Sequence, residues 1–101
     1  MSIQEALPTG FLVYLLGDAW GHFKVGRTRN LKARLQTLQT GNAGPLTVEA
    51  WLACSSESHA IEIERVTKGL LAGHETGGGD EWFYVDFDDA LKALECASDG
   101  R

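Results

Sequence analysis

The strongest constraint on this chain is a hairpin signal near its start. Residues 11–16 read FLVYLL, a run of apolar residues bounded by glycines. Its length, its borders and its strand-forming residues favour a buried central strand over a helix. Residues 17–21, GDAWG, then predict a hairpin loop, and residues 22–26, HFKVG, predict the return strand. We expect the return strand to end at Gly26.

Side chains alternate along a strand, so the return strand has two different faces. Phe23 and Val25 fall on one face, and His22 and Lys24 fall on the other. If the two strands pair as a hairpin, Tyr14 and Lys24 can lie on the same side of the sheet. A tyrosine and a lysine would then be held on two rigid, neighbouring elements.

The remaining sequence alternates between helical and strand patterns. Helices are expected at residues 31–40, 57–72 and 88–97, and strands at residues 47–54 and 82–85. This order predicts an α+β fold, a small and mostly antiparallel sheet with helices packed against it. A chain of 101 residues suits one core. We expect a loose lead-in over residues 1–10, a single domain over 11–97 and a frayed tail over 98–101.

The first predicted helix has a clear start and a clear buried face. Thr28 or Asn30 can cap it through a side-chain oxygen. Its leucines recur at helical spacing and form one apolar stripe: Leu31, Leu35 and Leu38. Arg34 lies beside this stripe on the helical wheel, so its side chain can point toward the sheet.

The second predicted helix places a carboxylate among apolar neighbours. Its apolar face is expected to hold Ala60, Ile63, Val66, Leu70 and Leu71. On the helical wheel Glu64 lies at the border of this face, and a carboxylate enclosed in this way needs a partner or a bound cation. Trp51, Trp82 and Phe83 are expected in the core.

Charge is distributed unevenly along the chain. The net charge is −5, which argues against a dedicated high-affinity nucleic-acid binder. Residues 19–48, however, contain five of the nine basic residues and no acidic residue. These five are the expected nucleic-acid contacts: Lys24, Arg27, Arg29, Lys32 and Arg34.

Other composition signals are ordinary for a soluble protein. Cys54 and Cys96 form no metal-binding spacing with the three histidines and are expected to be reduced, partly buried thiols. The first residues lack the basic and apolar segments of a signal peptide, and the longest apolar run is too short to cross a membrane. We expect a soluble, cytoplasmic protein without a membrane partner.

The two predicted strands carry a pair of short motifs, VYL at residues 13–15 and KVG at residues 24–26. With the following string FKVGRTRNLKARLQTLQT, they resemble the GIY-YIG nuclease superfamily, in particular its T5orf172/MUG113-type branch. The resemblance covers about residues 13–85. It includes Arg34, eight residues after Gly26, Glu64 in an A-x-x-x-E run, and Asp80 to Phe83, similar to the branch's EWF ending.

The resemblance implies a three-stranded antiparallel sheet flanked by helices and a metal-dependent endonuclease that hydrolyses DNA with an activated water. It implies that Tyr14 helps to activate the water, that Lys24 takes the place of the second-motif tyrosine, that Arg34 binds the phosphate, and that Glu64 holds Mg²⁺ or Mn²⁺. One carboxylate is chemically adequate for magnesium, which keeps several of its waters. A guanidinium fork suits a phosphate.

The sequence departs from the superfamily pattern at the groups that move protons. Lys24 replaces a tyrosine, Leu38 stands where many members have a histidine or tyrosine, and Thr67 stands where the E-x-x-L-H pattern of the branch has a histidine. Each site residue also has a purely structural interpretation: Tyr14 as a core tyrosine, Lys24 and Arg34 as solvated charges, and Glu64 as an ion-pair partner of Lys68.

Three functions therefore stay open at this point. The first is a metal-dependent endonuclease acting on DNA, with RNA as a second possible substrate. The second is a catalytically degenerate nucleic-acid-binding module of the same fold. The third is a protein-interaction module. We expect no separate recognition domain in a chain of this length, and an additional protein partner is therefore a candidate for supplying target recognition.

Overall fold

The computed structural model describes residues 7–76 and 82–99, and its α+β class agrees with the sequence prediction. Four strands form one antiparallel sheet in the order β3-β1-β2-β4. The strands are β1 (Thr9–Gly17), β2 (His22–Asn30), β3 (Thr47–Ala53) and β4 (Trp82–Tyr84). The helices are α1 (Leu31–Thr40), α2 (Glu57–Leu70) and α3 (Phe87–Asp99).

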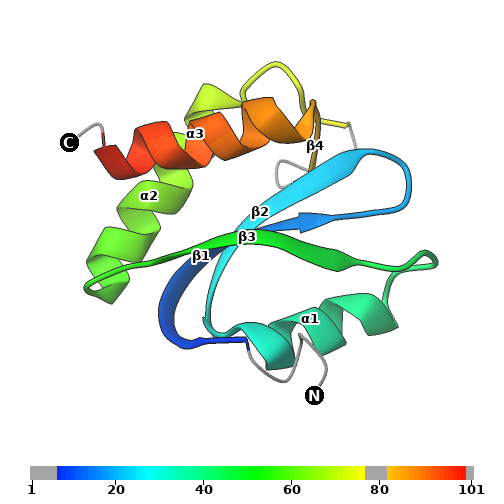
Figure 1. Ribbon diagram of the computed structural model, residues 1–101, viewed down its shortest axis with the longest axis horizontal. Helices are drawn as coiled ribbons and strands as arrows, with labels where there is room; N and C mark the ends of the chain where they lie inside the picture. The colour runs from blue at the N-terminus through cyan, green and yellow to red at the C-terminus, as the bar shows by residue number, and fades with distance from the viewer. Residues whose placement is uncertain (1–6, 77–81, 100–101) are drawn as a thin grey trace.

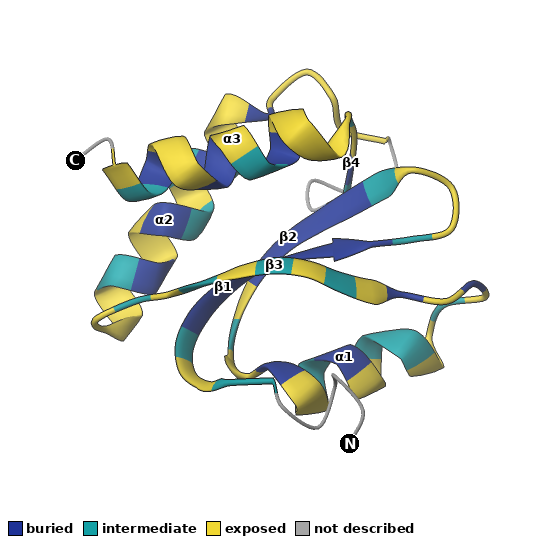
Figure 2. Ribbon diagram, viewed as in Figure 1, coloured by how far each residue is buried: buried dark blue, intermediate teal, exposed yellow. Residues whose placement is uncertain are grey.

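The helices cover both faces of the sheet. Helix α1 lies on one face, and α2 and α3 lie on the other (Figure 1). Strand β1 is central, so the residues from Leu12 to Gly17 are all buried (Figure 2). This explains why the first strand reads as an unbroken apolar run: alternate side chains enter two different cores.

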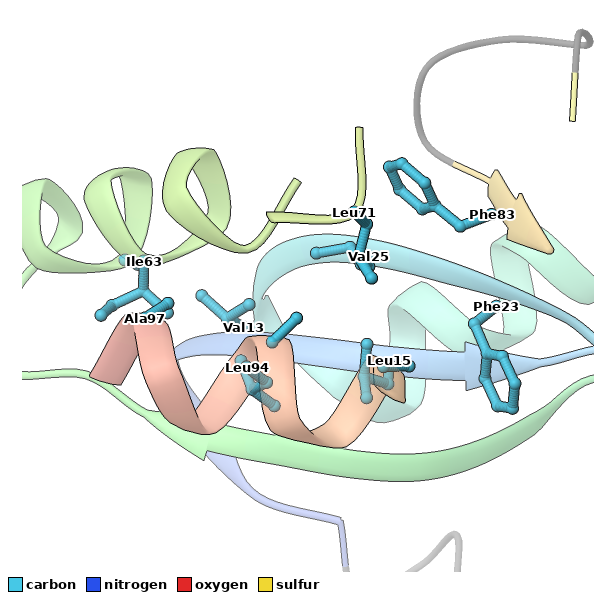
Figure 3. Packing of buried hydrophobic residues seen from close by; sticks show 12 residues of the cluster. Val13, Leu15, Phe23, Val25, Ile63, Leu71, Phe83, Leu94 and Ala97 are labelled. Carbon is cyan, nitrogen blue, oxygen red and sulfur yellow. The ribbon is translucent and has the colours of Figure 1, made fainter. Parts of the chain in front are cut away.

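The larger core lies between the sheet and helices α2 and α3. Val13 and Leu15 of β1 and Val25 of β2 point into it, as do Ile63 of α2 and Leu94 of α3 (Figure 3). Phe23 and Val25 share this face, as the alternation predicts.

The smaller core lies between the sheet and α1. It is built from Leu12, Tyr14 and Leu16 of β1 with Leu31 and Leu35 of α1. Leu38 is partly buried against the same cluster. The predicted bounds of α1 are confirmed, and the side chain of Asn30 caps it by accepting a hydrogen bond from Ala33 N at 3.1 Å.

Two expectations about the sheet are wrong. Strand β2 does not end at Gly26 but continues to Asn30, paired with β1 as far as Thr9. The sheet also has four strands instead of three, because the short strand β4 pairs with His22, Phe23 and Lys24 of β2. Within the described residues no strand pairs with this edge of β2 beyond Lys24, which leaves the edge from Val25 to Asn30 open.

Some expectations about burial are also wrong. Leu70 is 54% exposed, while Thr67 is fully buried and donates its hydroxyl to the carbonyl oxygen of Ile63 at 2.7 Å. The buried stripe of α2 therefore runs through Ile63 and Thr67. Trp51 is 44% exposed because it lies on the α1 face of the edge strand β3, while α1 packs over β1 and β2. Cys96 is exposed and only Cys54 is partly buried; both thiols are free.

The hairpin between β1 and β2 is closed by Asp18. Its Oδ1 accepts hydrogen bonds from the backbone N–H groups of Trp20 at 2.8 Å and His22 at 2.9 Å, and its Oδ2 lies 2.8 Å from His22 Nδ1. Burial of the carboxyl raises the pKa of Asp18, but these hydrogen bonds and the nearby imidazole outweigh burial and hold that pKa below its usual value.

Candidate functional site

An open cleft lies at the edge of β2, next to the place where its pairing with β4 stops. The cleft has a volume of about 340 Å³. Its walls come from β1, β2, α1 and α2, and its lining residues are Tyr14, Gly26, Arg27, Thr28, Arg34 and Glu64. Three of the four residues predicted to be catalytic therefore line one cleft, although they are far apart in the sequence.

The α1 side of the cleft holds Tyr14 and Arg34. Tyr14 is fully buried, and its hydroxyl accepts a hydrogen bond from Arg34 Nε at 3.3 Å. Arg34 is half-buried on α1 and points toward the sheet, as the helical wheel predicts. The phenol and the guanidinium are thereby fixed against each other on two rigid elements.

Gly26 gives the tyrosine ring its space. Tyr14 and Gly26 are directly paired across β1 and β2. A Cβ placed on Gly26 would lie 2.5 Å from Tyr14 Cζ and closer still to the hydroxyl oxygen, far inside van der Waals contact. Among the described residues, the glycines with positive φ are Gly10, Gly21 and Gly73, so glycine at position 26 is required by packing and not by backbone conformation.

The α2 side of the cleft holds Arg27 and Glu64. Arg27 follows Gly26 on β2, so its side chain points to the opposite face of the sheet, where α2 lies. Its Nε donates to Glu64 Oε1 at 2.9 Å, and Lys68 Nζ lies 3.1 Å from Glu64 Oε2. The side chain of Glu64 is only 17% exposed, so this carboxylate is held between two cations of its own chain.

The expected ion pair between Glu64 and Lys68 is present. The ion pair with Arg27 is not predicted from the sequence, which places Arg27 only among the expected nucleic-acid contacts. The alternation along β2 indicates only the face of the sheet, because Arg27 lies an even number of residues from the core residues Phe23 and Val25 and therefore shares their face. Nothing in the sequence indicated which residue of α2 it would meet.

Lys24 lies outside the cleft lining. It shares the face of Tyr14, as predicted, because Tyr14 pairs with Gly26 and Leu16 pairs with Lys24. The lysine is 5% exposed, and its Nζ lies 5.8 Å from the ring centroid of Trp82. Its role at the site stays a prediction.

The other basic residues of the predicted interface differ in their surroundings. Arg29 is exposed and its guanidinium lies 4.8 Å from the ring centroid of Phe11. Lys32 is exposed on the first turn of α1. Arg29 lies within the open edge of β2 and Lys32 follows it two residues after Asn30, but neither residue lines the cleft.

The two positions where a proton-transfer group was expected are structural. Leu38 packs against the smaller core, and Thr67 is fully buried in the larger one. Asp80 and Glu81 of the expected EWF ending lie outside the described residues. In the described part of the chain, no three His, Cys, Asp or Glu side chains gather as a metal cluster.

The arrangement can bind an anion. Arg27 and Arg34 line the cleft together with the mostly buried carboxylate of Glu64, which Lys68 also contacts, so the cleft carries more positive than negative charge in a chain whose net charge is −5. The guanidinium of Arg34 lines the cleft together with Gly26, which has no side chain of its own to cover the strand backbone, and a guanidinium in such a position is suited to bind a phosphate oxygen.

The fold and the cleft define the class of the protein: a small α+β domain with a basic cleft on the open edge of an antiparallel sheet. The family model of the T5orf172 domain matches residues 12–98, and the chain belongs to that family. The membership confirms the family named from the two motifs, is consistent with the GIY-YIG superfamily, and indicates a nuclease-like or DNA-binding module.

No curated protein and no solved structure matches the chain at a significant level. In the described residues, no helix is both long and apolar enough to cross a membrane.

Proposed function

We propose that this protein is a metal-dependent endonuclease that hydrolyses phosphodiester bonds of DNA in the cleft beside β2. The observation that carries the proposal is the convergence of Tyr14, Arg34 and Glu64 on one cleft. These residues come from three different elements and match the family's motifs position by position. A chance set of core and surface residues would not be expected to meet in this way.

The chemistry of the cleft fits a divalent cation at Glu64. The carboxylate is mostly buried and lines the cleft, and its oxygens are held by Arg27 and Lys68, so a metal ion would displace, or share an oxygen with, one of these cations. Magnesium needs few protein ligands, and Glu64 with solvent forms an adequate donor set. When bound, the metal would supply charge neutralisation at the phosphate oxygens and would acidify a coordinated water.

The chain's own residues would supply positioning and proton transfer. Arg34 would donate to a non-bridging phosphate oxygen and leave the hydroxyl of Tyr14 as a nearby acceptor. Tyr14 is held rigidly by β1 and by Gly26 beneath its ring, so its oxygen keeps one position. A phenol has a pKa of about 10, so a neighbouring cation is needed for it to accept a proton.

A plasmid-nicking assay with Mg²⁺ tests the proposal. Arg34→Ala and Glu64→Gln should each lower the rate by about 100- to 1000-fold, the usual loss of one charge-stabilising group. Arg65→Ala is the matched control, because Arg65 is exposed on α2 and pairs with Glu62 away from the cleft. Equal nicking by all four proteins would show that the cleavage came from a contaminant.

A second candidate is a nucleic-acid-binding module that does not cleave. It is favoured by the structural roles of Leu38 and Thr67, which leave the described cleft without a histidine. This function predicts duplex binding that weakens steeply with salt and no turnover with any divalent metal. Cleavage that needs Mn²⁺ and disappears in Glu64→Gln would eliminate it.

A further inference from the structure

Glu64 already has a cationic partner at each carboxylate oxygen. Arg27 Nε donates to Oε1 at 2.9 Å, and Lys68 Nζ lies 3.1 Å from Oε2. A metal ion at this carboxylate must therefore displace, or share an oxygen with, a side chain of the same protein.

The geometry indicates which partner gives way. Lys68 lies one turn further along α2 and does not line the cleft, whereas Arg27 comes from β2 and does. A cation that enters through the cleft therefore meets the oxygen held by Arg27. The second contact of Arg27, Nη1 to Glu57 Oε2, is 3.9 Å long and involves a carboxylate that is 68% exposed. This contact is too weak to hold the guanidinium in place.

We propose that Arg27 is a gating residue: it occupies Glu64 in the nucleic-acid-free protein, and it leaves Glu64 for a phosphate when nucleic acid and metal bind. This inference rests on the proposed function and adds to it the exchange of partners that accompanies the binding of metal and nucleic acid. The side chain of Arg27 is 41% exposed, so it can turn from the carboxylate to a phosphate without disturbing the core.

The gate makes metal and nucleic acid bind cooperatively. Without a phosphate, Arg27, Arg34 and Lys68 repel a divalent cation, and Arg27 competes with it for Oε1. A phosphate group neutralises this charge and gives Arg27 another partner, so it strengthens metal binding. By linkage, the metal strengthens nucleic-acid binding by the same factor.

The first test is a calorimetric titration of Mn²⁺ into the protein without nucleic acid. Arg27→Gln should bind Mn²⁺ roughly two- to fivefold more tightly than the wild type, because a half-exposed ion pair no longer competes. Arg29→Gln is the control, since it removes the same charge from the same strand without touching Glu64. Glu64→Gln should abolish the binding in every background.

The second test measures duplex binding in EDTA by fluorescence anisotropy of a labelled 20-base-pair DNA. Glu64→Gln should tighten binding several-fold by releasing Arg27, and the gain should disappear when Arg27→Gln is added. Glu62→Gln removes one negative charge from the same helix away from Arg27, and should change the affinity much less.

The outcomes separate the two proposals. Unchanged or weaker Mn²⁺ binding by Arg27→Gln, with binding still lost in Glu64→Gln, overturns the gate and leaves the metal site standing. Mn²⁺ binding that survives Glu64→Gln overturns the metal site itself, and the gate with it. A tightening in EDTA that persists in the double variant overturns the gate alone.

Discussion

Replacing Gly26 with alanine should disrupt the cleft by a purely steric route. The new methyl carbon would lie 2.5 Å from Tyr14 Cζ, and the ring is fully buried, so it cannot simply swing into solvent. Overpacking of this kind costs about 1–3 kcal/mol of folding free energy. The backbone at Gly26 needs no positive φ, so no backbone strain adds to this cost.

A double-mutant cycle isolates the free-energy cost of the clash between alanine at position 26 and the ring of Tyr14. Tyr14→Leu removes the atoms that clash, and in that background Gly26→Ala should stabilise by about 0.4–1 kcal/mol, because alanine restricts the unfolded chain. The coupling between the two sites combines the overpacking cost with this gain and is therefore expected to be about 1.4–4 kcal/mol. Urea denaturation measures all four free energies of unfolding.

Gly69→Ala provides the control for the same chemical change. Gly69 lies in the last turn of α2, and a Cβ there would meet nothing within 4 Å. The substitution should stabilise the protein by about 0.5–1 kcal/mol, the usual helix preference of alanine over glycine. If Gly26→Ala behaved like Gly69→Ala, or if its cost persisted in Tyr14→Leu, the steric reasoning would be refuted.

Two further predictions concern the ends of the hairpin. The pKa of Asp18 is lowered in the folded protein, so its charge stabilises the fold above the unfolded pKa of about 3.9, and this contribution is lost as the pH falls through the folded pKa. Asp18→Asn should therefore lower the stability at pH 7, and thermal melts in acid should show no difference in stability between the variant and the wild type. Asn30→Ala should cost about 1 kcal/mol in urea denaturation, because Ala33 N loses its capping oxygen; an unchanged midpoint would contradict the capping role.

Local signals were sufficient to predict α1 to the residue. Asn30 supplies the cap, Leu31 and Leu35 recur at helical spacing, and the loop that follows is marked by glycine. Each of these signals acts within a few residues, so no knowledge of the tertiary fold is needed to read them. The same holds for the faces of β2, which follow from strict alternation.

Errors arose where the cause is non-local. Gly26 was interpreted as the end of a strand, yet its lack of a side chain serves the ring of Tyr14 on the neighbouring strand. Trp51 is expected in the core, but the alternation of its strand does not reveal whether a helix covers the face on which it lies. The ion pair between Arg27 and Glu64 joins residues 37 positions apart, and a single sequence contains no signal for such a pairing.

The two arginines of the cleft differ in what they must give up to bind a phosphate. The hydrogen bond that Arg34 Nε donates to the hydroxyl of Tyr14 has an uncharged acceptor, and exchanging this bond for one to a charged phosphate oxygen is favourable. Arg27 donates to the carboxylate of Glu64, so the same exchange gains little unless another cation takes its place at Oε1. Arg34 should therefore engage a phosphate with or without metal, while Arg27 should do so only with metal.

The salt dependence of duplex binding distinguishes the two arginines. In EDTA, Arg34→Gln should reduce the slope of log affinity against log salt by about one, and Arg27→Gln should leave this slope nearly unchanged. An equal reduction by both variants would mean that the pairing with Glu64 does not withhold Arg27 from the nucleic acid.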